Sequence, residues 1–237
     1  MRLQTYARFG RDALRPGGMS PAVNALRRKL WSDADALGLG RDLRVAHTAP
    51  RAAVPITVRP MTPADAPAIL EAGATLTPEE NWDRRSRRLL LESGIGAPYV
   101  AATADDEPCY VQWLFGEADN DDVQRFFAGI FPVLRPGQAL LEGAFTPTVH
   151  RGKKIMSEAM SLIAERAVDI EAGQAHHVLT FVGTDNPASL KGCARAGFTD
   201  EIARRIETRL GRQKIDFRPL TNAVDPASQQ VGTGSSS

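Results

Sequence analysis

Short segments with alternating or continuous apolar positions predict the strands of a sheet. Residues 99–103 and 109–115 are apolar runs separated by the turn-forming residues 105–108, which predicts an antiparallel hairpin. Residues 178–182 are almost entirely apolar, as is typical of an interior strand. The predicted strands cover residues 56–60, 99–103, 109–115, 139–146, 178–182, 201–209 and 212–218.

Apolar positions that recur every three or four residues predict helices between these strands. The helix over 155–172 ends at Gly173, and Asn186 caps a short helix that runs to residue 196. The predicted helices cover residues 21–31, 77–91, 155–172 and 186–196, with two more starting near Thr62 and lying within 116–136. Strands and helices in this order predict a mixed α/β fold.

The pattern divides the chain into three parts. Residues 1–54 form a basic extension and connector, because a glycine-rich break at 37–40 and an Ala/Pro-rich stretch at 46–55 follow the first helix. Residues 55–220 form the main domain. Residues 221–237 lack core-forming side chains, which predicts a disordered tail.

Composition excludes several classes of protein. The chain has 237 residues, 43% of them apolar, but no run of 18 apolar residues and no apolar segment of the signal-peptide kind at its start. We therefore expect a cytoplasmic protein without a membrane segment. Cys109 and Cys193 do not have the spacing of metal ligands, so we expect reduced thiols and no metal site.

Charge is unevenly distributed along the chain, although the formal net charge is only +1. Residues 1–51 contain ten Arg or Lys against four Asp and no Glu, which gives about +6 there. Such an arm either contacts an acidic surface or packs as a solvated helix on its own domain. Because aromatic residues do not interleave with the arginines, we do not expect nucleic acid as a partner.

The stretch 139–157 combines a strand, a basic turn and a helix start. Backbone N–H groups in the first turn of a helix lack intrahelical acceptors, and the helix dipole adds partial positive charge there. Lys153 and Lys154 add two full charges. The sequence therefore predicts a phosphate-binding site at this helix N-terminus.

Two motifs in this order resemble those of the GNAT acyltransferase superfamily. Residues 151–156, Arg-Gly-Lys-Lys-Ile-Met, occupy the six positions of its pyrophosphate turn, Arg/Gln-x-x-Gly-x-Gly/Ala, with Lys154 and Met156 standing where small residues are usual. Residues 186–198, which begin with Asn-Pro and end with Gly-Phe, resemble its second signature. The resemblance covers about residues 55–218.

The resemblance implies an acyl-CoA-dependent N-acyltransferase, most simply an acetyltransferase using acetyl-CoA. In that family an amine, on a small molecule or a protein, attacks the thioester directly. It also implies that the strand over 139–146 parts from its neighbour at a bulge near Gly143, where the pantetheine arm binds exposed backbone groups. The residues expected to bind the acyl-CoA are Phe145, Thr146, Arg151, Gly152, Lys153, Lys154, Ile155, Met156, Ser157 and Asn186.

Glu142 is the predicted general base, since a carboxylate inside an apolar strand is costly unless it is paired or functional. An ion pair is the alternative role, and His150 is the second candidate base. Cys193 stands where the family commonly has a tyrosine that protonates the leaving thiolate. It is therefore the candidate acid, with a simple core position as the alternative.

Several interpretations stay open at this level. The departures at Lys154 and Met156 and the missing tyrosine are also compatible with a catalytically degenerate domain that binds acyl-CoA or a protein. Arg84, Arg85, Arg87 and Arg88 form either a solvated helix face or a contact for an anionic acceptor. The aromatic stripe within 116–136 is either core, a lid or a homodimer contact.

Overall fold

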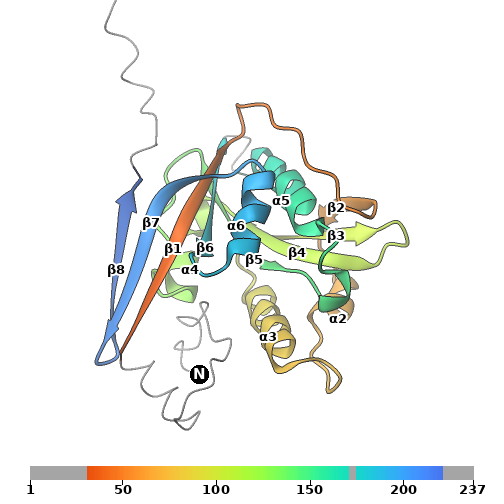
Figure 1. The fold of residues 1–237 in the computed structure, drawn as a ribbon, viewed down its shortest axis with the longest axis horizontal. Coiled ribbons are helices and arrows are strands. Elements are labelled where there is room, and N and C mark those ends of the chain that lie inside the picture. The colour runs from red at the N-terminus through yellow and green to blue at the C-terminus, as the bar shows by residue number, and fades with distance from the viewer. Residues whose placement is uncertain (1–30, 171–174, 221–237) are drawn as a thin grey trace, which may run out of the picture.

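The computed structural model describes residues 31–170 and 175–220, and within these ranges eight strands form one sheet (Figure 1). The strand order is β2-β3-β4-β5-β6-β1-β7-β8, and only β5 and β6 are parallel. The strands are β1 (Trp31–Asp42), β2 (Ile56–Pro60), β3 (Ala97–Thr103), β4 (Pro108–Phe115), β5 (Gln138–Phe145), β6 (His177–Gly183), β7 (Thr199–Arg209) and β8 (Arg212–Pro219).

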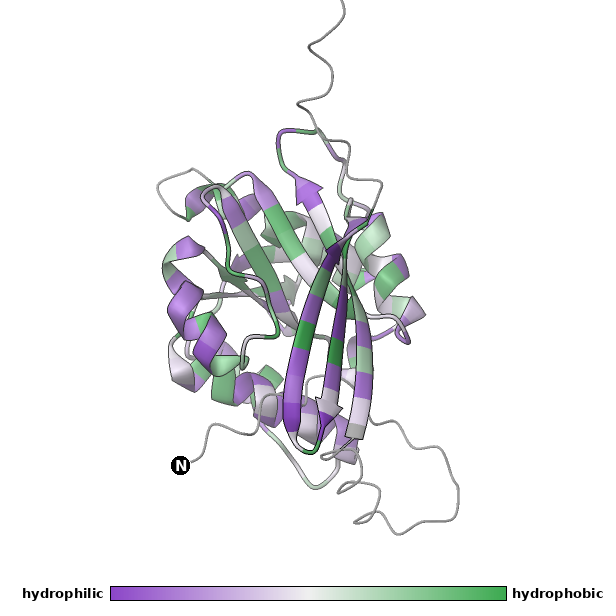
Figure 2. Cartoon of the chain, turned by 90° about the vertical axis from the view of Figure 1, so that its left-hand side faces the viewer, coloured by the Kyte–Doolittle hydropathy of each residue, from purple (hydrophilic) through white to green (hydrophobic). Residues whose placement is uncertain are grey.

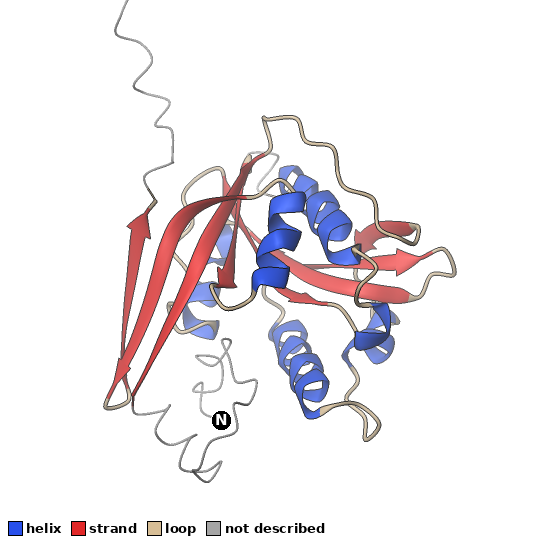
Figure 3. Ribbon diagram, in the orientation of Figure 1, coloured by secondary structure: helices blue, strands red, loops and turns tan. Residues whose placement is uncertain are grey.

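Helices cover both faces of the sheet (Figure 3). One core lies under α5 and α6, and a second lies under α2, α3 and the segment that follows α4. No helix within the described ranges is long and apolar enough to cross a membrane. The helices are α2 (Asp65–Leu70), α3 (Pro78–Ser93), α4 (Asn120–Phe126), α5 (Ile155–Glu165) and α6 (Pro187–Arg195), with short 3₁₀ helices η1 (Glu117–Asp119), η2 (Thr148–His150) and η3 (Arg166–Asp169).

All seven predicted strands are confirmed, including the hairpin of β3 and β4 and the interior position of β6. The predicted helices that fall within the described residues are confirmed, with shorter bounds in two places. The helix after the basic turn ends at Glu165 and tightens into η3, and α4 ends at Phe126 because Ala128 and Gly129 adopt positive φ. The aromatic stripe that follows is buried core.

The expected glycine-rich break at residues 37–40 is wrong. These residues lie in the middle of β1, which pairs with β6 on one side and β7 on the other. Gly38 and Gly40 leave room for the Phe181 ring and the Glu201 carboxyl, since a Cβ atom would come within 2.7 and 2.0 Å of them. The sheet thus includes residues that precede the boundary expected at residue 55.

The helix expected over 21–31 lies outside the described residues, apart from Trp31, which begins β1. The tail expected from residue 221 also lies outside them. Neither prediction is tested by the structure.

The strands β1, β7 and β8 alternate between apolar and polar positions (Figure 2). Their apolar side packs into the core beneath α4, while charged side chains of the other side pair across the strands. Arg205 contacts Asp33, Asp35 and Glu207 at 3.3, 3.5 and 2.8 Å. These outer strands therefore form an extension with one half-buried apolar face and one charged face.

Arg41 connects β1 to both helices of one face. Its guanidinium donates to the carbonyl and hydroxyl oxygens of Ser161 at 2.9 Å, to the Ala196 carbonyl at 3.3 Å and to Glu165 at 2.9 Å. Arg41 is 5% exposed, so these partners replace water that it has lost. β1 is consequently part of the folded unit.

We predict that Arg41→Ala lowers the free energy of unfolding by about 2–4 kcal/mol, because it leaves several buried acceptors without a donor. Arg44→Ala is the matched control, since Arg44 is 68% exposed and, among the described residues, pairs with neighbouring Asp42 alone. Urea denaturation followed by circular dichroism measures both. Equal midpoints for the two variants would contradict the bracing role of Arg41.

Candidate functional site

The strands β5 and β6 pair over a short distance and then separate. Three residue pairs join them, the last between Leu140 and Leu179, although both strands continue beyond it. The predicted parting of this strand from its neighbour is confirmed. Backbone groups in the opening need other partners, so the opening is the first candidate for a binding site.

A β-bulge shapes β5 at the same point. The register with β4 shifts so that Gly143 and Ala144 together face the single residue Gln112. Gly143 has φ 75°, and a Cβ atom there would lie 3.0 Å from the Trp113 ring. The bulge predicted from Gly143 is therefore confirmed, and a side chain at this position would be strained and crowded.

Glu142 lies at the opening between β5 and β6. Its Oε1 accepts a hydrogen bond from the Phe181 N–H at 2.6 Å and a longer one, at 3.5 Å, from the Thr180 hydroxyl. Burial raises the pKa of Glu142 to about 7, because these hydrogen bonds offset only part of the cost of desolvating the carboxylate. Among the described residues no cation forms an ion pair with it, so the alternative of a structural salt bridge is not supported.

Two arginines act on Glu142 from a longer distance. Arg87 of α3 and Arg204 of β7 both lower the pKa of Glu142 through their charges. Arg204 stacks on Phe131 and Phe181, with its central carbon 5.6 and 5.1 Å from the ring centres. The carboxyl thus feels the charge of two largely desolvated cations without forming an ion pair with either among the described residues.

The predicted solvated face of α3 is only partly correct. Arg85 and Arg88 are exposed, but Arg84 is buried and Arg87 is half-buried, and their central carbons lie 5.7 and 5.9 Å from the centre of the Phe145 ring. Arg87 donates to the backbone carbonyls of Gly143 and Ala144 rather than facing an open anion site. The 3.6-residue repeat of the helix turns these two side chains inward, which the run of arginines in the sequence did not reveal.

The basic turn from Arg151 to Lys154 leads from η2 into α5. Gly152 has φ 80° with open space around it, whereas Lys154 adopts φ 59° as the N-cap residue of α5. A lysine in this left-handed conformation costs roughly 1 kcal/mol. Arg151 is exposed and donates to the Thr146 carbonyl at 3.0 Å, which fixes the start of the turn.

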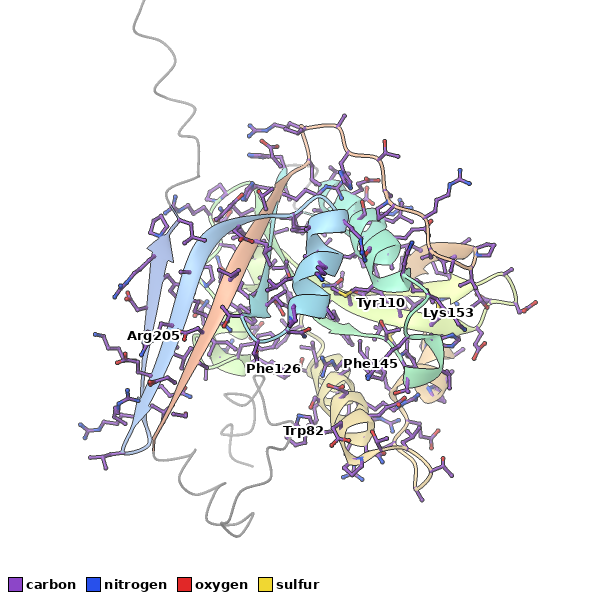
Figure 4. The ribbon with its side chains drawn as sticks, viewed as in Figure 1. Trp82, Tyr110, Phe126, Phe145, Lys153 and Arg205 are labelled. Atoms are coloured by element: carbon purple, nitrogen blue, oxygen red, sulfur yellow. The ribbon has the colours of Figure 1, made fainter. Side chains whose placement is uncertain are left out.

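The first turn of α5 has no side-chain cap. The N–H groups of Ile155, Met156 and Ser157 therefore have neither a cap nor an intrahelical acceptor. The Ile155 side chain points into the core, so only its backbone can face a ligand. Met156 and Ser157 pack against Gly192 of α6, where an added Cβ atom would lie 3.2 Å from the Met156 sulfur. Figure 4 marks Phe145 and Lys153 at the two ends of the stretch from β5 to this helix.

A strap over residues 43–55 holds the start of α5 from outside. The Ala53 N–H donates to the Lys153 carbonyl at 2.8 Å, and the Ala52 N–H donates to the Glu158 carboxylate at 2.5 Å. From the sequence we predict only a connector here, because an Ala/Pro-rich stretch does not indicate which backbone groups it will contact. Lys153 thereby becomes half-buried, while Lys154 stays exposed.

Cys193 lies in the core between α6 and α5. It is 1% exposed, its sulfur is 3.7 Å from the Met160 sulfur, and burial raises the pKa of its thiol to about 12. Tyr110 is also fully buried, donates to Gln112 and has a pKa raised well above its usual range by burial. Neither group is tuned to release a proton near neutral pH, so burial weighs against the expected acid role of Cys193.

Asn186 and His150 occupy structural positions at the edge of the site. The Asn186 side chain caps α6 by accepting from the Ser189 N–H at 3.1 Å. His150 is 7% exposed, its Nε2 lies 3.4 Å from Glu107, and its Nδ1 has no partner among the described residues. His150 contacts the hairpin turn before β4, while Glu142 lies at the opening, so the geometry favours Glu142 as the base.

Comparison with known proteins supports the architecture described above. The sequence model of the family described as acetyltransferase (GNAT) domain matches residues 56–199, which are more than half of the chain. Comparison with functionally curated proteins finds no match.

Two solved structures illustrate the similarity. A GNAT-family acetyltransferase from Colwellia psychrerythraea is 15% identical, with a TM-score of 0.48 and coverage of 80% of this chain and 62% of that one. A GCN5-related N-acetyltransferase from Sphaerobacter thermophilus is 16% identical, with a TM-score of 0.45 and coverage of 79% and 56%. This chain thus spans about three fifths of their lengths. The sequence match over β2 to the start of β7, and not these scores, carries the assignment: the chain belongs to the GNAT acetyltransferase family.

Proposed function

We propose that this protein is an acyl-CoA-dependent N-acyltransferase, most simply an acetyltransferase, acting on a primary amine of a small molecule or a protein. The observation that carries this proposal is the position of Glu142. Its carboxyl has a pKa near neutrality and lies where β5 and β6 separate, on the strand that leads through η2 to the uncapped N-terminus of α5.

In this proposal the phosphates of the acyl-CoA bind the first turn of α5. The N–H groups of residues 155–157 supply directed donors, and Lys153 and Lys154 supply charge. The pantetheine arm extends along β5 into the opening. An adjacent backbone N–H of the bulge donates to the thioester oxygen, where negative charge develops during transfer.

The proposed transfer proceeds in a ternary complex. The amine nitrogen attacks the thioester carbonyl carbon, the C–N bond forms, and the C–S bond breaks to release coenzyme A thiolate. Glu142 accepts the proton that the nitrogen loses, directly or through water, and the thiolate takes up a proton from solvent or from a neighbouring group. A carboxyl with a pKa of about 7 can change protonation state near physiological pH.

Release of free thiol from acetyl-CoA in the presence of a panel of primary amines tests the proposal. We expect thiol release that depends on at least one amine and scales with enzyme concentration. Binding of acetyl-CoA without turnover for any amine would support a binding module instead. Absence of binding by calorimetry would overturn the proposed function altogether.

We predict that the double variant Lys153→Ala, Lys154→Ala binds coenzyme A about tenfold more weakly at low ionic strength. Two cations beside a helix N-terminus stabilise phosphates through charges that salt screens, so the difference should shrink at 0.5 M salt. Lys214→Ala is the control, because Lys214 is exposed on β8 at the edge of the sheet. Titration calorimetry at two salt concentrations measures all three proteins.

We predict that the turnover number of the wild-type protein rises with pH through about 7 and then levels off, because Glu142 must be ionised to accept a proton. Glu142→Gln should lower the turnover number by about 10²–10⁴-fold and abolish this pH dependence. If the turnover number of the variant still rose with pH through about 7, Glu142 would be excluded as the base.

A stability measurement tests the raised pKa of Glu142 without the need for an amine substrate. The pKa of Glu142 is raised in the folded state, so its contribution to stability is present at pH 4 and is lost as pH rises through about 7. Glu142→Gln should therefore gain roughly 3 kcal/mol relative to wild type between pH 4.5 and pH 8. Denaturant midpoints at the two pH values measure the difference, and parallel curves would contradict the raised pKa.

A further inference from the structure

Arg87 makes an unusual set of contacts for a buried side chain. Its Nε donates to the Gly143 carbonyl at 3.3 Å, one terminal nitrogen donates to the Ala144 carbonyl at 3.0 Å, and the other donates to Asp83 at 2.8 Å. The side chain is 13% exposed. A helix residue 56 positions away in sequence thus binds both carbonyls of the β5 bulge.

These two carbonyls belong to consecutive peptide units. In a regular strand consecutive carbonyls point in opposite directions, and only the bulge lets one guanidinium reach both. Because a trans peptide places its C=O and N–H on opposite sides, the N–H groups of Ala144 and Phe145 point away from Arg87. Ala144 has no residue paired with it in the register with β4, as expected for a residue within a bulge.

We infer that Arg87 is a positioning residue, which holds the bulge so that the Ala144 N–H is aimed at the carbonyl oxygen of a bound acyl thioester. This inference rests on the proposed function, since it assigns a determinant of the same site. Arg87 acts without touching the reacting atoms. Its positive charge on the two carbonyls also polarises the same peptide units, which strengthens their N–H groups as donors.

The guanidinium suits this role better than an ammonium would. A planar fork binds two acceptors in fixed geometry, while a lysine side chain offers a single mobile point charge. The Phe145 ring lies 5.9 Å from the Arg87 central carbon, and Asp83 fixes the third nitrogen. The orientation of the Arg87 guanidinium is therefore fixed by hydrogen bonds from all three of its nitrogens.

Arg84 provides a matched control on the same helix. Its side chain is 10% exposed, it lies 5.7 Å from the same Phe145 ring, and it forms an ion pair with Glu80. Its backbone partners, however, are the carbonyls of Ala68 and Glu71, not the bulge. Removing Arg84 therefore costs a similar amount of packing and charge without releasing the bulge.

The test uses acetyl-CoA labelled with carbon-13 at the thioester carbonyl, observed by NMR when bound to the full chain. In the wild-type protein we expect a downfield shift of this carbon on binding, because its oxygen accepts a hydrogen bond. Arg87→Met and Arg87→Lys should both lose most of the shift, while Arg84→Met keeps it. For any amine found to be a substrate, the Arg87 variants should lower the turnover number about 10²-fold with little change in the KM for acetyl-CoA.

The outcomes separate this inference from the proposed function. Bound acetyl-CoA without a shift in the wild type, or with the full shift in either folded Arg87 variant, would overturn the role of Arg87 and leave the acyl-CoA site standing. Equal loss of the shift in Arg84→Met would also overturn it. Acetyl-CoA that does not bind the wild type would remove the proposed function itself.

Discussion

The separation of β5 from β6 is the constraint on which the rest of the site depends. A parallel pair that opens inside a sheet leaves backbone donors and acceptors that must be satisfied where little water reaches. The protein meets this requirement with one side chain of β5 itself and one of α3. Glu142 accepts a hydrogen bond from the Phe181 N–H, and Arg87 donates hydrogen bonds to the carbonyls of Gly143 and Ala144. The opening is thus held apart by specific hydrogen bonds.

The same opening brings three ionisable side chains into a largely apolar region. Glu142 is desolvated near Arg87 and Arg204, yet neither arginine is close enough to form an ion pair with it. Long-range attraction lowers its pKa, and burial raises it by more. A directly paired carboxylate would stay ionised well below neutral pH, so the distance to the arginines is what brings Glu142 close to neutrality.

Residues outside the family match also shape the site. β1 fills the sheet between β6 and β7, and Arg41 fastens it to α5 and to the end of α6. The strap that follows binds the Lys153 carbonyl and the Glu158 carboxylate at the first turn of α5. The segment from residue 31 to 55 therefore braces the basic turn that the matched region supplies.

Local patterns in the sequence determined the strands, most helix starts, the bulge at Gly143 and the strand, basic turn and helix that form the candidate site. These follow from side-chain periodicity, capping and glycine conformation, which depend on near neighbours. Only the tertiary structure decided that residues 37–40 form a central strand, because their glycines are explained by Phe181 and Glu201 from distant strands. It also decided that Arg87 turns inward onto the bulge and that Cys193 is a core thiol, since burial depends on what packs against a residue and not on the residue itself.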